Sequence, residues 1–76
     1  MTLKEFNTFK ENINKECDNY QKKYPFLSKG EIIFNLTKKE FPATVNRIKN
    51  TQADPTDNDN NITQFWNLLQ RKLITS

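Results

Sequence analysis

Residues 27–36 join a helix-start pattern to the densest apolar run in the chain, and this stretch constrains the fold most strongly. Ser28 can cap a helix, and Glu31, three residues later, can return a hydrogen bond to the cap backbone. Leu27 and Ile32 occupy the staple positions on either side of that cap. The next apolar residues spread around most of the helix circumference, as in a helix that is contacted on several sides. They are Ile32, Ile33, Phe34 and Leu36.

The pattern therefore predicts a central helix from Lys29 to Lys39 or Glu40, where Pro42 forces the chain out of helical geometry. Gly30 is the only glycine of the sequence and falls in the first turn of this helix. Its missing side chain leaves room for another helix to approach closely.

The N-terminal third of the chain predicts one long amphipathic helix. Thr2 and Glu5 form a capping box at its start. Apolar residues then recur at spacings of three and four, within about 120° of each other on a helical wheel. They are Leu3, Phe6, Phe9, Ile13, Cys17, Tyr20 and Tyr24. Pro25 disfavours helical dihedrals at the residue before it, so the helix should end at Tyr24 or just before.

A short third helix is predicted to begin at Pro42, which suits the first helical position, and to end near Lys49. Asn50 would follow it as the residue in the left-handed conformation. Residues 51–61 contain no apolar residue larger than alanine, which predicts an exposed, acidic loop.

The last helix is predicted to open with Asn61 as its cap and Gln64 three residues later. Its apolar residues fall on one face, and they are Ile62, Phe65, Trp66, Leu69 and Leu73. Together these patterns predict an all-α fold: a small bundle of four helices, the third of them short, with one acidic loop before the last helix. At 76 residues, the whole chain from 1 to 76 should form a single helical domain.

Composition excludes several classes of function. The chain has no histidine and a single cysteine, Cys17, which excludes Cys/His zinc sites, internal disulfides and catalysis with a histidine base. No paired carboxylates, serine constellation or glycine-rich phosphate loop is evident, so we expect neither an enzyme nor a cofactor. Cys17 falls within the apolar stripe and suits a buried thiol in a reducing, cytoplasmic setting. No apolar run approaches the roughly 20 residues of a membrane span.

The acidic loop partly matches a calcium-binding loop. Asp57, Asp59 and Asn61 occupy positions one, three and five of such a loop. Position six would be Ile62, where a glycine is needed, and position twelve would be Leu68, where a glutamate is needed. We therefore expect no metal and interpret the loop as a solvated turn whose Asp and Asn side chains bond the local backbone and cap the helix that follows, with an acidic recognition surface as the alternative.

Two surfaces are candidates for binding. The first is a protein interface on the loop and the last helix, formed by Asn50, Thr51, Asp54, Asp57, Asp59 and Trp66. The alternative interpretation of Trp66 is that it belongs to the core. The large number of aromatic residues implies that some of them are exposed. The second is a basic patch for DNA or RNA around Pro42, formed by Lys38, Lys39, Arg47 and Lys49. A solvated basic face without a partner is the alternative for that patch.

A pattern spread over about half of the chain resembles a group of small uncharacterised proteins of bacteriophages and prophages of Gram-positive bacteria. The residues that align with the pattern are Gly30, Phe34, Asn35, Pro42, Ile48, Lys49, Asn50, Thr51, Asp54, Pro55, Asp59, Ile62 and Phe65. The chain departs from the pattern with Glu31 for glutamine, Asn50 for glycine and Thr56 for phenylalanine. The resemblance implies a phage-related origin and, for a protein of this size, action by binding another protein.

The sequence thus favours a small, non-enzymatic protein-interaction module, in which a helical scaffold presents the loop to a host or phage protein that it binds or inhibits. The alternative is a small DNA- or RNA-binding protein that uses the basic middle segment. No membrane association is expected. The identity of the partner and the oligomeric state stay open at this point.

Overall fold

The computed structural model of the protein describes residues 1–49, 51, 53–56 and 58–74. These residues form α1 (Leu3–Lys23), α2 (Lys29–Glu40), α3 (Pro42–Asn46), the 3₁₀ turn η1 (Asp59–Asn61) and α4 (Ile62–Leu73). The described chain contains no strand, which confirms the predicted all-α fold with a short third helix.

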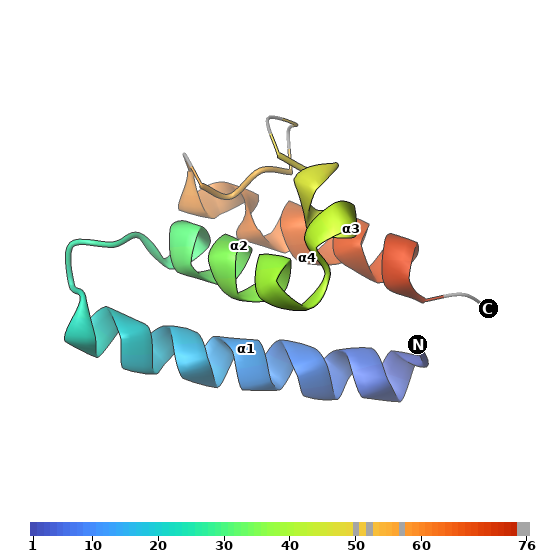
Figure 1. Ribbon diagram of the computed structural model, residues 1–76, viewed down its shortest axis with the longest axis horizontal. Coiled ribbons are helices and arrows are strands. Elements are labelled where there is room, and N and C mark those ends of the chain that lie inside the picture. The colour runs from blue at the N-terminus through green and yellow to red at the C-terminus, as the bar shows by residue number, and fades with distance from the viewer. Residues whose placement is uncertain (50, 52, 57, 75–76) are drawn as a thin grey trace.

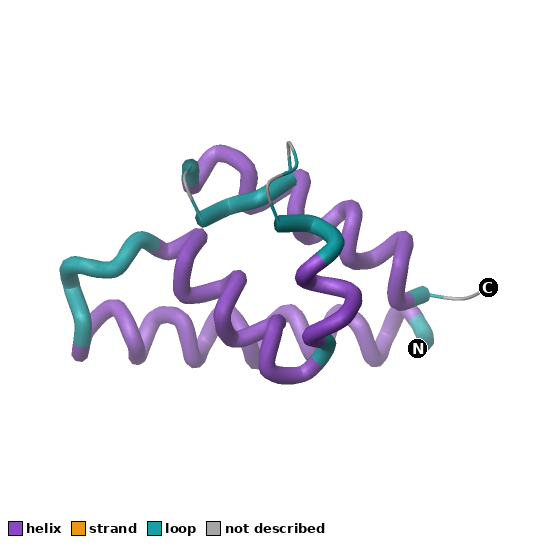
Figure 2. Tube along the Cα trace, turned by 45° about the horizontal axis from the view of Figure 1, so that its top comes forward, coloured by secondary structure: helices purple, strands orange, loops and turns teal. Residues whose placement is uncertain are grey.

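The helices form a bundle with α2 in its middle. Figure 1 shows α1 running along one side of α2 in the opposite direction, with α3 and α4 on the other side. The loop after α3 returns across the molecule, so that η1 lies near the start of α2, and α4 then runs back toward the first residue of α1 (Figures 1 and 2). Helix α2 contacts α1, α3 and η1, as expected for the central helix.

Helix α1 has the predicted capping box and buried stripe. The Thr2 hydroxyl accepts a hydrogen bond from the Glu5 backbone N–H at 3.1 Å, and the Thr2 backbone N–H donates to the Glu5 carboxylate at 3.0 Å. The Thr2 backbone hydrogen bond lowers the pKa of Glu5, because it favours the charged carboxylate. Phe6, Ile13 and Cys17 bury the inner face, and the helix ends at Lys23, before Pro25, as predicted.

Helix α2 begins with Ser28, whose hydroxyl accepts a hydrogen bond from the Glu31 N–H at 3.2 Å. Four large apolar side chains of α2 are buried, and they are Ile32, Ile33, Phe34 and Leu36. Thr37 is also buried, and its hydroxyl bonds the carbonyls of Ile33 and Phe34 within the helix. The helix is therefore enclosed by its neighbours along most of its circumference.

Helix α3 is shorter than predicted, because it ends at Asn46 and not near Lys49. The chain then tightens, with the Ile48 N–H donating to the Val45 carbonyl at 3.0 Å in a three-residue pattern that is typical of helix ends. This tightening keeps both Val45 and Ile48 in the core, each at 0% exposure. Asn50, the predicted left-handed residue, lies outside the described residues.

The loop before α4 is only partly exposed, which corrects the prediction of a solvated turn. Ala53, Asp54 and Pro55 are buried. The loop packs on the first turn of α2 at Gly30, where an added Cβ would collide with the Pro55 carbonyl and lie 3.0 Å from Asp59 Oδ1. The close approach predicted at Gly30 therefore exists, but the neighbour is the loop and not another helix.

The last helix has Asn61 at its N-cap position, as predicted, but among the residues that the structure describes it lacks the predicted side-chain cap bond. Asn61 makes no side-chain cap of α4 within the described chain, and its amide donates instead to the Asp54 carbonyl at 3.0 Å. The side chain of Asn58 opens the preceding turn by accepting from the Asn60 N–H at 2.9 Å. The start of α4 is therefore set by η1, whose last residue directly precedes the helix.

We expect Phe34→Ala to lower the free energy of unfolding by about 3–5 kcal/mol, because it empties a buried aromatic site in the central helix. Phe34 is 3% exposed and packs on Phe65 with the ring centroids 6.1 Å apart. Phe26→Ala is the matched control, since Phe26 is 80% exposed and its loss should change stability by about 0.5 kcal/mol or less. Urea denaturation measures both, and a loss below about 1 kcal/mol for Phe34→Ala would contradict the central position of α2.

Candidate functional site

Most of the predicted protein-interface residues are engaged within the fold. Asp54 is buried, and its carboxylate accepts from both the N–H and the hydroxyl of Thr56, at 2.9 and 2.6 Å. The Thr51 hydroxyl donates to the Ile48 carbonyl at 2.6 Å and accepts from the Ala53 N–H at 3.2 Å. These bonds shape the loop from within, so the predicted exposure of Asp54 on a binding surface is wrong.

Asp59 ties the loop to the central helix. Its carboxylate accepts a hydrogen bond from the Gly30 N–H in the first turn of α2, at 2.9 Å. A carboxylate at this end of a helix satisfies a free N–H and faces the positive end of the helix dipole. The described residues contain no group of three or more His, Cys, Asp or Glu side chains that could share a metal ion. Asp59 is thus placed as a cap for a distant helix.

Trp66 belongs to the core, which corrects its placement on an interface. It is 3% exposed and contacts Phe6 and Phe9 edge to face, with ring centroids 6.0 and 6.3 Å away. The Lys10 ammonium lies 5.7 Å from the centre of the indole ring. Asn50 and Asp57, the remaining two predicted interface residues, lie outside the described residues.

The end of α1 and the turn after it carry three aromatic side chains, the exposed Tyr20 and Phe26 and the half-buried Tyr24, which we call the aromatic corner. Tyr20 and Tyr24 stack with ring centroids 6.0 Å apart, and Phe26 meets Tyr24 edge to face at 6.0 Å. Tyr20 is 39% exposed and Phe26 is 80% exposed, so the prediction that some aromatics are exposed is confirmed. The helix ends at Lys23, before Pro25, and Phe26 therefore lies in the turn and outside the buried stripe of α1.

A shallow groove of about 230 Å³ between α1 and α2 adjoins the aromatic corner. It is lined by Tyr20, Leu27, Ile32, Asn35, Leu36 and Lys39. The corner itself is basic, because residues 19–30 include Lys22, Lys23 and Lys29 and no Asp or Glu. The Lys23 ammonium lies 5.6 Å from the centre of the Tyr24 ring, a cation–π arrangement. The corner and the groove together offer apolar surface framed by positive charge.

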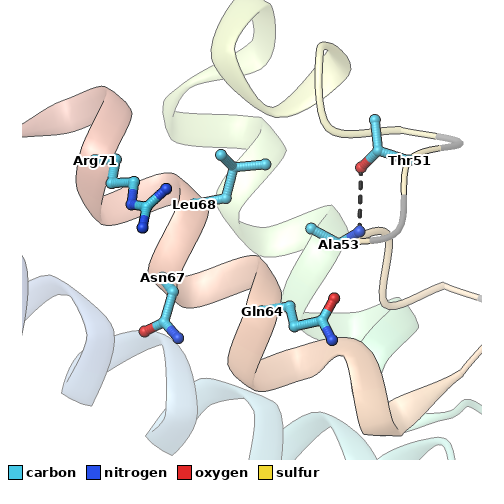
Figure 3. Close-up of a pocket in the computed structure, with 6 residues that line it drawn as sticks. All are labelled: Thr51, Ala53, Gln64, Asn67, Leu68 and Arg71. Carbon is cyan, nitrogen blue, oxygen red and sulfur yellow. Dashed lines mark hydrogen bonds between the residues drawn. The ribbon is translucent and has the colours of Figure 1, made fainter.

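A second and larger hollow, of about 560 Å³, lies between α4 and the loop at Thr51 and Ala53. Figure 3 shows Gln64, Asn67 and Arg71 spaced along α4, with Thr51 and Ala53 on the facing loop. Leu68 completes the lining, and none of these residues is acidic. This hollow, which we call the α4 groove, therefore presents amide and hydroxyl groups and one positive charge, from Arg71, beside the apolar Ala53 and Leu68.

The four predicted nucleic-acid contacts belong to two different parts of the fold. Lys38 and Lys39 lie in the last turn of α2, and Lys39 lines the groove that adjoins the aromatic corner. Arg47 and Lys49 are exposed in the turn that follows α3. Thr51, two residues after Lys49, lines the α4 groove.

Sequence reasoning missed the two sites for different reasons. Tyr20 and Tyr24 fit the apolar stripe of α1, which predicts that they are buried. The end of α1, however, extends past the start of α2 (Figure 1). Phe26 stands outside every apolar period, and this was the available signal for the aromatic corner. The α4 groove depends on how the loop folds back on α4, which no local pattern encodes.

No family model, no curated protein and no solved structure matches this chain. Within the described residues, no helix is both long and apolar enough to cross a membrane.

Cys17 is fully buried, with its sulfur 3.8 Å from the Lys29 carbonyl, and burial raises the pKa of the thiol because the thiolate is poorly solvated. A raised pKa means that the unfolded state loses its proton first as the pH rises. We therefore expect stability to fall above about pH 8.5, the ordinary pKa of a thiol, and to fall more steeply than in Cys17→Ala. Urea denaturation of both proteins from pH 7 to 10 measures this. If the free energy of unfolding falls equally with pH in both proteins, the raised pKa of the Cys17 thiol is contradicted.

Proposed function

We propose that the protein is a non-enzymatic protein-interaction module and that the aromatic corner is its contact surface. The observation that carries the proposal is the exposure of Phe26, a large apolar side chain that is 80% accessible at a helix corner. Stability gives no reason to keep such a residue there, because exposed apolar surface contributes nothing to the core. Aromatic residues of this kind are enriched among the residues that dominate binding energy in protein interfaces.

The energetics of the corner suit binding. Burying one aromatic side chain removes about 150–250 Å² from water, which at about 25 cal/mol per Å² is worth roughly 4–6 kcal/mol before the cost of association. Tyr20 and Tyr24 are stacked, so little side-chain freedom remains to be lost at the corner when a partner binds. Phe26 would then be the residue on which affinity depends most.

The chemistry of the surface defines the kind of partner. The groove beside the corner is mainly apolar, with Leu27, Ile32 and Leu36 in its lining, and it suits an inserted apolar side chain. Lys23 and Lys39 flank that surface and favour acidic groups around the inserted side chain. We therefore propose a partner segment that combines an apolar anchor with acidic neighbours.

The biological setting is part of the same proposal. The resemblance to phage and prophage proteins of Gram-positive bacteria supports a phage-related origin and a host or phage protein as the partner. The buried thiol of Cys17 supports a reducing, cytoplasmic setting. Binding that inhibits the partner is the mode of action we propose.

We expect Phe26→Ser to weaken partner binding by about 30-fold, the effect of removing one residue that dominates an interface. Partners are first captured from a lysate of a Gram-positive host with the wild-type protein, and their affinity is then measured with purified components. Leu3→Ser is the matched control, because Leu3 is also an exposed apolar residue, 52% accessible, but lies at the opposite end of α1.

The proposal predicts that Leu3→Ser binds like the wild type and that both variants keep the helical circular dichroism of the fold. Equal binding by Phe26→Ser and the wild type would contradict the aromatic corner as the contact surface. Equal loss in both variants would show binding through nonspecific apolar contact and would contradict it as well.

A further inference from the structure

The exposed face of α4 is polar and free of acidic residues. Thr63, Gln64, Asn67 and Arg71 are all exposed and fall within about 100° of one another at 100° per residue. Phe65, Trp66 and Leu69 occupy the opposite face and are buried in the core. The polar face spans about 12 Å along the helix at 1.5 Å per residue. It is therefore a rigid row of hydrogen-bonding groups, held in place by the core behind it.

The side chains along this row are available to a ligand. Gln64, Asn67 and Arg71 line the α4 groove, and none of them bonds another residue in the part of the chain that the structure describes. The facing wall is fixed, because the Thr51 hydroxyl bonds both the Ile48 carbonyl and the Ala53 N–H. Figure 3 shows Gln64 and Arg71 at either end of the α4 wall of the groove.

The charged residues of α4 and of the segment 41–53 are all basic. Residues 41–53 and 60–76 carry Arg47, Lys49, Arg71 and Lys72 and contain no Asp or Glu. The nearest acidic side chains of the described loop bond other parts of the fold. Asp54 is buried and accepts from Thr56, and Asp59 caps α2. The groove and its rim therefore favour an anionic ligand over a neutral one.

From this arrangement we propose that α4 binds duplex DNA, with its polar face directed into the major groove. The major groove is about 12 Å wide and admits an α-helix, and a 12 Å row covers three to four base pairs. Asn and Gln amides pair with adenine and the Arg guanidinium with guanine at the base edges. Arg47, Lys49 and Lys72 supply positive charge for the phosphates.

An acidic protein segment is the competing ligand, and the lining of the groove argues against it. The α4 groove contains no aromatic residue, and only Leu68 and Ala53 offer apolar surface. Amide and guanidinium groups in a row suit base edges better than they suit the apolar anchors of a protein interface. This DNA-binding surface is separate from the aromatic corner and does not depend on the protein-interaction proposal.

The test is fluorescence anisotropy with a labelled 20-base-pair duplex of mixed sequence, and with one of its strands alone, at 50 and 200 mM salt. Three phosphate contacts, from Arg47, Lys49 and Lys72, predict a log-log salt slope of about −2.7, so affinity should fall about 40-fold between the two conditions. Lys72→Gln should reduce the slope by about 0.9, and Lys72→Arg should restore it, because the slope counts the charges that neutralise phosphates. The double variant Gln64→Ala/Asn67→Ala should bind more weakly at an unchanged slope, because amides release no counterions.

Two matched controls separate this surface from the others. The double variant Lys38→Gln/Lys39→Gln removes two charges away from the α4 groove, and Phe26→Ser removes the aromatic corner; both should bind DNA with wild-type affinity. No binding to the duplex at 50 mM salt with about 100 µM protein would overturn the proposal. Binding to the single strand alone, binding that depends on Lys38 and Lys39 in place of Lys72, or capture of an acidic polypeptide in competition with the duplex would also overturn it.

Discussion

The structure depends on the docking of the loop before α4 onto the first turn of α2. Gly30 makes this possible, because the Pro55 carbonyl occupies the space that a Cβ would fill. Asp59 then bonds the Gly30 N–H, so one residue of the loop satisfies a helix end that lies 29 residues earlier in the chain. This contact fixes where α4 begins, and thus how Phe65 meets Phe34 across the core. This tie acts together with core contacts between the two ends of the chain, such as that of Phe6 with Trp66.

The same docking separates structural residues from residues that are free to bind. The structural residues have roles in packing: Gly30, Pro55 and Asp59 join loop to helix, and Phe34 and Phe65 meet in the core. In the aromatic corner, Phe26 packs on Tyr24 but leaves most of its surface exposed. The exposed face of α4 has no partner within the described chain. The two proposed binding surfaces are therefore those that the fold leaves unused.

The helices could be predicted from the sequence because their information is local. The capping box at Thr2 and Glu5, the prolines at 25 and 42 and the apolar spacing in α1 and α4 each act within a few residues. The loop could not be predicted in this way. Its polar composition indicated exposure, but Asp54 and Asn61 are satisfied by bonds to Thr56 and to the loop backbone, which allow polar residues to be buried. Of the predicted interface residues, Asp54 is buried for this reason and Trp66 is buried in the core, whereas Thr51 and Asp59 are exposed.

The stability of Gly30→Ala tests the docking most directly. Helix propensity alone predicts that alanine stabilises a helix relative to glycine, by up to about 1 kcal/mol. The docked loop predicts the opposite sign, a loss of about 1–3 kcal/mol, because the methyl group must displace the backbone at Pro55. Asn35→Ala, at an exposed position of the same helix, is the control for propensity and should be neutral or slightly stabilising. Urea denaturation of both variants decides the matter: a loss confined to Gly30→Ala is the predicted result, and a gain in stability for Gly30→Ala would contradict the docking of the loop on α2.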